Sequence, residues 1–199
     1  MTPREIKRFL EAYAPKKNRT IVIVDYSNVE KWKEGLGWKI KIQELANLIK
    51  HFSYGNQFLR RFYYGSDYGP DNKATQLVQW SESVLTAANM NRFEVITKRV
   101  KYIHADTTPP SYRPKCDLDV EMTVDLIKER DNYDSIILFS GDGDLMCAID
   151  YLHRDYGKEC FVFGARGYTG KEIFDAKASG VVKNVFFAED FEHRLNIRH

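Results

Sequence analysis

Two short segments of the chain place carboxylates directly after apolar runs. Residues 140–144 read Ser-Gly-Asp-Gly-Asp and follow the apolar run 135–139, so Asp142 and Asp144 come where a buried strand would end. Asp25 likewise follows the apolar run 21–24. In open parallel α/β sheets, ligands bind outside the carboxyl ends of the strands. The two segments therefore predict an acidic site at one edge of a sheet.

A third group of acids lies at the start of a predicted helix. Asp117, Asp119, Glu121 and Asp125 fall within nine residues that follow a proline-containing loop. Asp117 and Asp119 both fit a helix cap as well as a functional role. Asp125 comes six residues after Asp119, about 240° further around a helix, so the two cannot point the same way. We expect Asp119 to join the strand-end acids and treat Asp125 as the weaker candidate.

Convergence of these acids would create a site for a divalent cation. If Asp25, Asp119 and either Asp142 or Asp144 share one pocket, their like charges need compensation. Oxygen ligands alone suit Mg²⁺ or Mn²⁺, which bind through a few carboxylates together with substrate phosphate oxygens. Such an ion could activate water and neutralise charge during phosphoryl displacement.

Two neutral polar residues adjoin the acids. Asn28 supplies an oxygen or amide donor, or caps a turn after the strand. Ser140 is expected to cap the following helix or to orient a ligand rather than act as a nucleophile, because no glycine precedes it by two residues and no histidine has a partner motif. The chain also lacks a Gly-x-x-x-x-Gly-Lys-Ser/Thr phosphate loop, and Ser27 stands where an Asp-x-Asp phosphotransferase would have its second acid.

The apolar periodicity predicts alternating strands and helices. Strands are expected at 20–25, 57–64, 93–97, 134–139, 159–163 and 182–187, and helices at 4–13, 40–52, 73–89, 118–129, 145–156 and 171–178. Residues 31–37 are expected to be irregular and 98–114 to form a long loop. The order predicts an α/β fold with a mainly parallel central sheet of five or six strands and helices on both faces. A helical extension at 1–19 would precede one domain at 20–187, and a tail would follow at 188–199.

Length and composition indicate a single globular domain without a membrane segment. The 199 residues are 43% hydrophobic, and no apolar run reads as a signal peptide or a transmembrane helix, so we expect a cytoplasmic protein. Cys116, Cys147 and Cys160 are an odd number without paired spacing, which favours buried thiols over disulfides or a zinc site.

Basic residues cluster near the predicted strand ends although the net charge is only +2. If the substrate is a nucleic acid, phosphate contacts are expected from Lys31, Lys33, Arg99, Lys101, Arg113 and Lys115. Tyr26, Trp32 or Trp38 could stack on an unpaired base, although each aromatic also fits core or loop packing. A solvated surface of mixed charge is the alternative reading of the same cations.

The three acidic segments together resemble the NYN domain family, particularly its bacterial LabA-like branch. The resemblance rests on Val-Asp-Tyr-Ser-Asn at 24–28, on Lys115 with Asp119, Val120 and Asp125, and on residues 140–144 followed by Gly157 and Lys158. This family belongs to the PIN-like and FLAP-nuclease-like superfamily, and the resemblance covers roughly residues 20–165.

The resemblance implies a PIN-like three-layer α/β/α sandwich and a metal-dependent ribonuclease. Its catalytic acids would be Asp25, Asp119, Asp142 and Asp144, and the first three would bind Mg²⁺ or Mn²⁺. Supporting roles would fall to Asn28, Ser140, Asp117 and Asp125. Residues 31–38, the loop 106–114 and the segment after 165 are not explained by the family pattern.

The leading hypothesis is therefore an endoribonuclease that acts on single-stranded RNA. A non-catalytic RNA-binding or regulatory protein is the main alternative, because it would need the basic loops but not the acids. A phosphoesterase for small molecules is the second alternative. The expected partner is RNA rather than a membrane, and a homodimer remains open.

Overall fold

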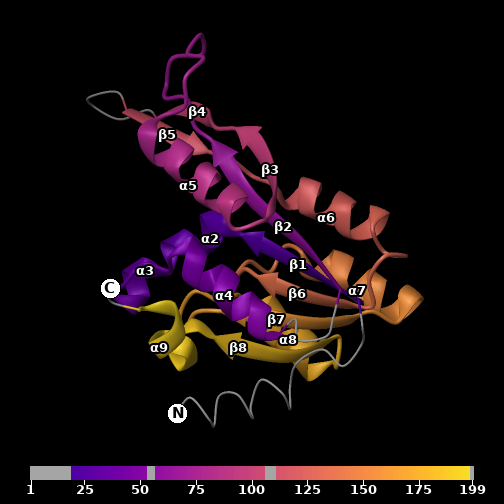
Figure 1. Cartoon of the computed structure of the whole chain (residues 1–199). Coiled ribbons are helices and arrows are strands. Elements are labelled where there is room, and N and C mark those ends of the chain that lie inside the picture. The colour runs from indigo at the N-terminus through magenta and orange to yellow at the C-terminus, as the bar shows by residue number, and fades with distance from the viewer. Residues whose placement is uncertain (1–18, 53–56, 106–110, 198–199) are drawn as a thin grey trace.

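Six parallel strands form the central sheet, in the order β3-β2-β1-β6-β7-β8 (Figure 1). The computed structural model describes residues 19–52, 57–105 and 111–197. The strands are β1 (Arg19–Asp25), β2 (Gln57–Ser66), β3 (Glu94–Arg99), β6 (Ser135–Phe139), β7 (Glu159–Gly164) and β8 (Val182–Phe187). The strand order reverses between β1 and β6, which makes their carboxyl ends the topological switch point where ligands bind in such sheets.

Helices cover both faces of this sheet. They are α2 (Tyr26–Lys31), α3 (Lys33–Leu36), α4 (Ile42–Phe52), α5 (Gln79–Met90), α6 (Asp119–Lys128), α7 (Met146–Tyr156), α8 (Lys171–Ala178), the 3-10 helix η1 (Ala188–Phe191) and α9 (Glu192–Leu195). The buried side chains of α2, α4, α5 and α9 pack on one face, and those of α6, α7 and α8 pack on the other. The predicted α/β/α sandwich with a parallel sheet is confirmed. The helix expected at 4–13 lies outside the described residues.

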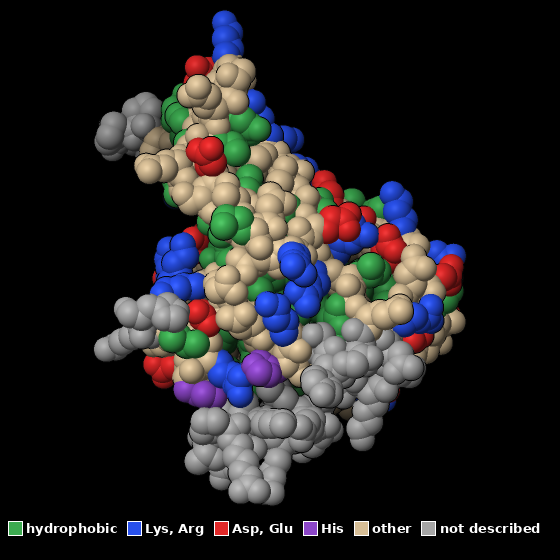
Figure 2. Space-filling view, in the orientation of Figure 1, with side chains coloured by type: hydrophobic (Ala, Val, Ile, Leu, Met, Phe, Trp, Pro, Cys, Tyr) green, Lys and Arg blue, Asp and Glu red, His purple; other side chains and the backbone are tan. Residues whose placement is uncertain are grey.

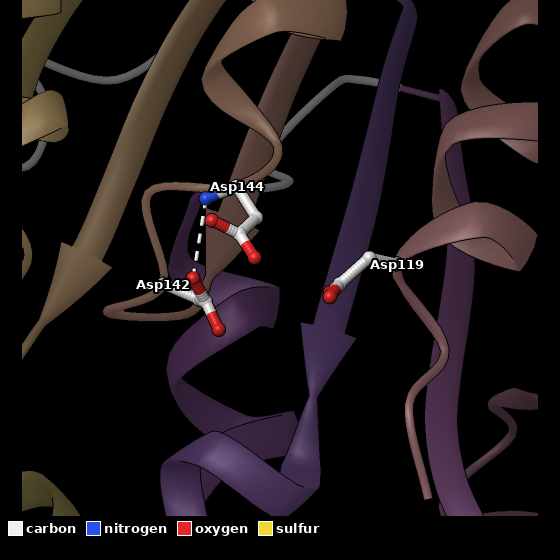
Figure 3. A group of neighbouring side chains, drawn as sticks. All are labelled: Asp119, Asp142 and Asp144. Atoms are coloured by element: carbon white, nitrogen blue, oxygen red, sulfur yellow. Dashed lines mark hydrogen bonds between the residues drawn. The ribbon is translucent and has the colours of Figure 1, made fainter.

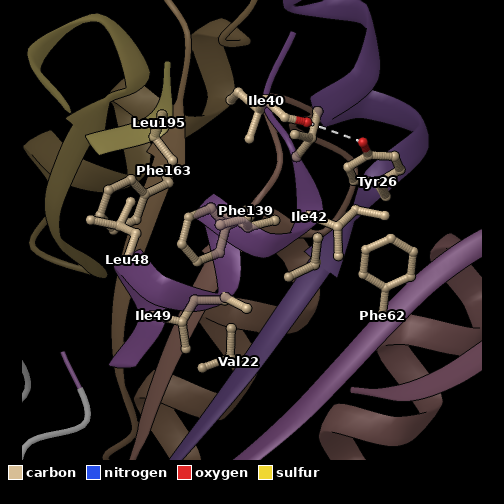
Figure 4. Close-up of a cluster of buried hydrophobic side chains, with 14 of the residues drawn as sticks. Val22, Tyr26, Ile40, Ile42, Leu48, Ile49, Phe62, Phe139, Phe163 and Leu195 are labelled. Atoms are coloured by element: carbon tan, nitrogen blue, oxygen red, sulfur yellow. Dashed lines mark hydrogen bonds between the residues drawn. The ribbon is translucent and has the colours of Figure 1, made fainter. Parts of the chain in front are cut away.

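Alternation along the central strands divides the core between the two faces. In β1, Val22 and Val24 face the α4 side, while Ile21 and Ile23 face the α6 and α7 side. All four are fully buried, as expected for a strand that is covered on both faces. On the α4 side, Phe163 stacks on Phe139 with ring centroids 4.5 Å apart (Figure 4). The packed interior holds the ends of β1 and β6 in fixed register.

The segment 98–114, expected to be a long loop, contains a hairpin instead. Strand β4 (Lys101–Ala105) pairs antiparallel with β5 (Ser111–Lys115), and Lys101 lies opposite Lys115. The loop prediction was wrong because every residue of β5 is exposed and Pro114 lies within it, so the strand has none of the apolar alternation of a core strand. The hairpin and α5 form the upper arm of the molecule in Figure 1.

Other boundaries differ more modestly. Residues 31–37 are largely helical rather than irregular, and α5 begins at Gln79 instead of residue 73. At the other end, the segment after residue 187 continues as η1 and α9, whose Phe191 and Leu195 are buried in the core. The cysteines are free thiols, of which Cys160 is buried but Cys147 is exposed, so the expectation of buried thiols was wrong for Cys147. No helix within the described ranges is both long enough and apolar enough to cross a lipid bilayer.

Candidate metal centre

Asp25 is the last residue of β1 and lies at the switch point. Its Oδ1 accepts a hydrogen bond from the backbone N–H of Asn28 at 3.2 Å, which caps α2. Its Oδ2 accepts a hydrogen bond from the Ser140 hydroxyl at 3.1 Å. The side chain is deeply buried, and burial raises the pKa of Asp25 above its ordinary value, although both hydrogen bonds lower it. The carboxyl group therefore connects β1 to the end of β6.

Asn28 joins the same two strand ends through its side-chain oxygen. Oδ1 accepts hydrogen bonds from the backbone N–H of Gly141 and from Trp32 Nε1, both at 2.9 Å. Asn28 therefore does not cap the turn after the strand, since Asp25 caps α2 there. Its carbonyl oxygen fixes the start of the 140–144 loop against α2.

The loop at 140–144 is shaped by hydrogen bonds between its own residues. The fully buried Ser140 hydroxyl accepts a hydrogen bond from the backbone N–H of Asp142 at 3.1 Å while it donates to Asp25. Asp142 Oδ1 in turn accepts from the backbone N–H of Asp144 at 3.1 Å (Figure 3). Helix α7 begins later and has no side-chain cap, so the expectation that Ser140 caps it was wrong. Ser140 instead orients the two strand-end acids.

A glycine is required at position 141 because a neighbouring backbone lies against it. A Cβ atom there would lie 1.8 Å from the carbonyl oxygen of Tyr168. The backbone N–H of Gly170 also donates to the Gly141 carbonyl at 2.8 Å. The segment after β7 thus packs directly against the acidic loop and holds it together with Asn28.

Asp119 reaches the loop from the first turn of α6. Its backbone N–H donates to Asp117 Oδ1 at 3.1 Å. Lys98, at the end of β3, donates to the Asp117 carbonyl at 3.0 Å and forms an ion pair with Glu121 at 2.8 Å. Lys98 thereby anchors the start of α6 at the sheet edge. Sequence reasoning assigned Lys98 no role in the site, because its sequence neighbours are basic and only the fold brings α6 beside it.

Three carboxylates converge at this edge. Asp119, Asp142 and Asp144 each place one oxygen so that all three lie within 4.8 Å of one another (Figure 3). Opposite ligands of an octahedral Mg²⁺ ion lie about 4.2 Å apart, because each bond is about 2.1 Å long. The spacing of the three oxygens is therefore close to what one such ion requires. The donor set, which is oxygen alone, fits Mg²⁺ or Mn²⁺.

The charge at this edge is poorly compensated by the protein itself. Burial, a hydrogen bond with Asp117 and the negative charges of Asp117, Asp142 and Asp25 raise the pKa of Asp119 to about 7. The pKa of Asp117 is lowered, mainly by its hydrogen bonds from Asp119. The Asp119 carboxyl is therefore only partly ionised near neutral pH, and a divalent cation bound there would displace its proton.

The other predicted acids have different surroundings. Asp25 is outside the set of three, although its charge contributes to the raised pKa of Asp119. Asp125 accepts a hydrogen bond from the Tyr63 hydroxyl at 2.7 Å, so it is directed away from the cluster. This direction agrees with the helical spacing that separated Asp125 from Asp119.

The predicted RNA-binding cations fall into three groups. Lys31 and Lys33 line a cavity of about 310 Å³ beside α2 and α3. The second group is exposed on the hairpin and consists of Lys101, Arg113 and Lys115. Lys101 pairs with Lys115, and Arg113 lies two residues before Lys115 on the same strand. All three cations therefore lie on one face of the hairpin.

Arg99 forms the third group, because it is used within the fold. Its Nη2 donates to the carbonyls of Asp71, Asn72 and Ala74 at 3.0–3.2 Å, and its guanidinium lies 4.5 Å from the centroid of the Tyr68 ring. Arg99 therefore stabilises the loop at 71–74, and its predicted contact with RNA has less support than that of the other cations.

The aromatic residues considered for base stacking are mostly unavailable. Tyr26 and Trp32 are each only 1% exposed, so the structure supports core packing, the other role considered for them, rather than base stacking. The Tyr26 hydroxyl donates a hydrogen bond to the Ile40 carbonyl (Figure 4). Trp38 packs against the core. Trp80, which the sequence did not single out, is 51% exposed.

The fold and the site define an α/β protein with an acidic centre at the switch point of a parallel sheet. The profile described as the NYN domain matches residues 19–183, so this chain belongs to the NYN domain family. NYN domains are generally nucleases, and membership implies an RNA-related function. The predicted family resemblance is confirmed.

Two individual proteins extend this comparison. The chain is 38% identical over 84 residues to the low amplitude and bright protein LabA of Synechococcus elongatus, a match that covers 42% of this chain and 45% of LabA. The chain thus spans less than half the length of this curated relative. The crystal structure of a protein of unknown function, VPA0982, from Vibrio parahaemolyticus has a TM-score of 0.64 at 20% identity, with 89% of this chain and 96% of that chain covered. This second likeness supports the fold.

Proposed function

We propose that this protein is a metal-dependent endoribonuclease that hydrolyses RNA phosphodiester bonds. The observation that carries the proposal is the convergence of Asp119, Asp142 and Asp144 at the switch point, beside the buried Asp25. Carboxylates this close repel one another, and a divalent cation would compensate their charge. Membership of a family whose members are generally nucleases supports a phosphodiester as the substrate of this site.

Each residue of the site has a distinct part in the proposed mechanism. Asp119, Asp142 and Asp144 would hold Mg²⁺ or Mn²⁺, which supplies activation of water and neutralises charge on the phosphodiester. Asp25 accepts the Ser140 hydroxyl hydrogen bond and so keeps the 140–144 loop in place. Asp117 positions the first turn of α6 through its hydrogen bond with the Asp119 backbone.

The cations on two sides of the acids would position the RNA backbone. Burial raises the pKa of Asp25 and the charge of Lys31 partly opposes this, while Lys115 adds to the hydrogen bonds from Asp119 that lower the pKa of Asp117, so both lysines act electrostatically on the acidic site. Lys101 lies directly opposite Lys115 on the hairpin, and Arg113 continues the same basic face two residue pairs further along. A single strand that follows these cations would pass the acidic centre. Single-stranded RNA is therefore the proposed substrate, while a cytoplasmic location and a homodimer stay predictions.

Cleavage of an internally labelled, circular single-stranded RNA tests this proposal. The wild type should linearise the circle with Mn²⁺ and not with EDTA, and Asp142→Asn should abolish cleavage while it retains RNA binding. Asp155→Asn, which changes an exposed acid on α7, should cleave like the wild type.

The other outcomes separate the alternatives. RNA binding without cleavage in the wild type would favour a non-catalytic RNA-binding protein. Hydrolysis of p-nitrophenyl phosphate but not of RNA would favour a small-molecule phosphoesterase. Equal cleavage by the wild type and Asp142→Asn would refute the assigned site.

A further inference from the structure

A cavity of about 310 Å³ opens beside the acidic centre, at the carboxyl end of β2. Its lining includes Ser27, two residues after Asp25, and Cys116, three residues before Asp119. The cavity therefore adjoins both β1 and the start of α6. Its volume lies at the lower end of the range for ligand pockets, about 300–1,000 Å³, which suits a group of the size of one nucleotide. Figure 2 shows this side of the molecule hollowed between the upper arm, which carries α5 and the hairpin, and the body below.

One wall of the cavity is the exposed indole of Trp80, in the first turn of α5. Trp80 meets Tyr64 edge to face, with ring centroids 6.0 Å apart and an interplanar angle of 84°. About half of the indole is open to solvent, although so large an apolar group would normally be more buried. Its wide π-surface is therefore available to a planar ligand.

Buried hydrogen bonds fix Trp80 in this position. The neighbouring Ser81 is fully buried, and its hydroxyl donates to the Gly65 carbonyl at 3.2 Å and accepts from the Asp67 backbone N–H at 3.1 Å. The backbone N–H of Val78 donates to the Asp67 carbonyl at 2.9 Å. These bonds tie the start of α5 to the end of β2, so the indole is presented by a rigid part of the fold rather than by a loose loop.

The charges around the cavity leave its cations available. Glu30 accepts a hydrogen bond from the Tyr64 hydroxyl at 2.8 Å and pairs with Lys39 at 3.1 Å. Both carboxylate oxygens of Asp67 lie 2.9 Å from the Tyr102 hydroxyl and accept its hydrogen bond. The cavity is thus lined by two carboxylates that already have partners and by exposed lysines of α2 and α3. Glu34 is exposed and also lines the cavity, so its carboxylate could accept a hydrogen bond from an amino group of a ligand.

We infer that this cavity binds one unpaired nucleobase of the RNA, stacked on Trp80, with Lys31 and Lys33 contacting the flanking phosphates. The inference rests on the proposed function and adds to it a residue that positions the substrate. An aromatic platform beside a cationic rim is the combination by which proteins bind single strands. A base held there would place its adjoining phosphodiester toward Asp119 and Asp142, so the cavity would select the nucleotide next to the cleaved bond.

Fluorescence anisotropy of a labelled single-stranded RNA, measured in EDTA, tests the inference. Trp80→Ala should weaken RNA binding by about five- to tenfold. This is the lower end of the effect known for the loss of one base stack, and we expect it because about half of the indole stays open to solvent. Trp80→Phe retains an aromatic face and should lose at most about twofold. Phe174→Ala, which removes an exposed aromatic from α8 on the other face of the sheet, should bind like the wild type.

A scan with one abasic nucleotide identifies the stacked position. In the wild type, one abasic position should weaken RNA binding by the same factor as Trp80→Ala does. In the Trp80→Ala variant, an abasic nucleotide at that position should weaken RNA binding no further. Trp80→Leu, which keeps an apolar side chain at the mouth of the cavity but has no aromatic face, allows the same cycle to be read if Trp80→Ala folds poorly. Additive effects of the abasic site and the Trp80 change would overturn the inference.

The failure of this inference can be told apart from the failure of the proposed function. If the wild type binds and cleaves RNA and Trp80→Ala does so equally well, the base site is wrong while the nuclease stands. If the wild type neither binds nor cleaves single-stranded RNA, the proposed function fails and the base site fails with it.

Discussion

The side chain of Asn28 provides a sharp test of how the acidic loop is held. Its Oδ1 accepts from Gly141 N and from Trp32 Nε1, so Asn28→Ala removes one acceptor and leaves two donors without partners. Trp32 is almost fully buried, and Gly141 is buried as well.

The magnitude follows from the two orphaned donors. Each buried donor that loses its acceptor costs about 1–3 kcal/mol, and partial access of water to Gly141 N reduces its share, so we expect a loss of about 3 kcal/mol in the free energy of unfolding. Release of the Gly141 N–H also frees the loop that carries Asp142. We therefore expect Mn²⁺ to bind about 10- to 100-fold more weakly, as when a residue that supports metal ligands is removed.

Urea unfolding and calorimetry with Mn²⁺ would measure the two effects. Asn89→Ala is the matched control, because that asparagine makes one hydrogen bond, to the Leu85 carbonyl, on the exposed side of α5. The control should change the free energy of unfolding by less than about 0.5 kcal/mol and leave Mn²⁺ binding intact. Equal stability of Asn28→Ala and Asn89→Ala would refute the reasoning that Asn28 joins the two strand ends.

Three further predictions follow from the same site. Ser140→Ala removes the hydroxyl that lies between Asp25 and Asp142. It should lower the free energy of unfolding, measured with urea, by about 1 kcal/mol, and it should weaken Mn²⁺ binding, measured by calorimetry, about tenfold or more. Undiminished Mn²⁺ affinity would contradict this prediction. The pKa of Asp119 in the folded protein is raised to about 7. The group therefore contributes fully to the free energy of unfolding when the pH is below the ordinary pKa of an aspartate, and this contribution is lost as the pH rises through about 7. The metal-free protein should lose stability over that interval in thermal unfolding while Mn²⁺ affinity rises, and an affinity independent of pH would count against the site. Lys101→Met should reduce the slope of log K for RNA against log salt by about 0.7, and an unchanged slope would remove the hairpin face from the RNA contact.

Much of the fold could be predicted because the core strands are buried on both faces. The apolar runs 21–24 and 135–139 each end at a polar residue, and β1 and β6 end within one residue of the predicted positions. The helix at 171–178 and the strand at 182–187 match the predicted bounds. In these elements, local periodicity and tertiary packing agree, so the sequence pattern alone is informative.

The hairpin and the two buried aromatic residues could not be predicted in the same way. Strand β5 is stabilised by pairing with β4, and an exposed strand has no hydrophobic period to reveal it. Trp32 lies between two lysines, a context typical of a surface loop, yet the turn from α2 to α3 directs its ring into the core. Such burial depends on the path of the backbone, which no local pattern specifies.

It was easier to predict which acids lie at the site than to predict which of their carboxylates lie close together. Asp119 and Asp142 lie together as the segments suggested, but Asp144 completes the set of three and Asp25 lies outside it. Sequence spacing placed all four near one sheet edge, but it carries no information on which carboxylate is held by Ser140 and which is open to a ligand. Side-chain direction at a loop is decided by hydrogen bonds that only the folded chain forms.

The most direct test of the central claim is an anomalous difference map from crystals of the protein grown with Mn²⁺. We predict a peak at which Mn²⁺ lies about 2.0–2.3 Å from carboxylate oxygens of Asp119, Asp142 and Asp144, and no peak at this place in Asp142→Asn. A map from crystals at saturating Mn²⁺ with no peak among these three carboxylates, or with the ion bound elsewhere, would contradict the account.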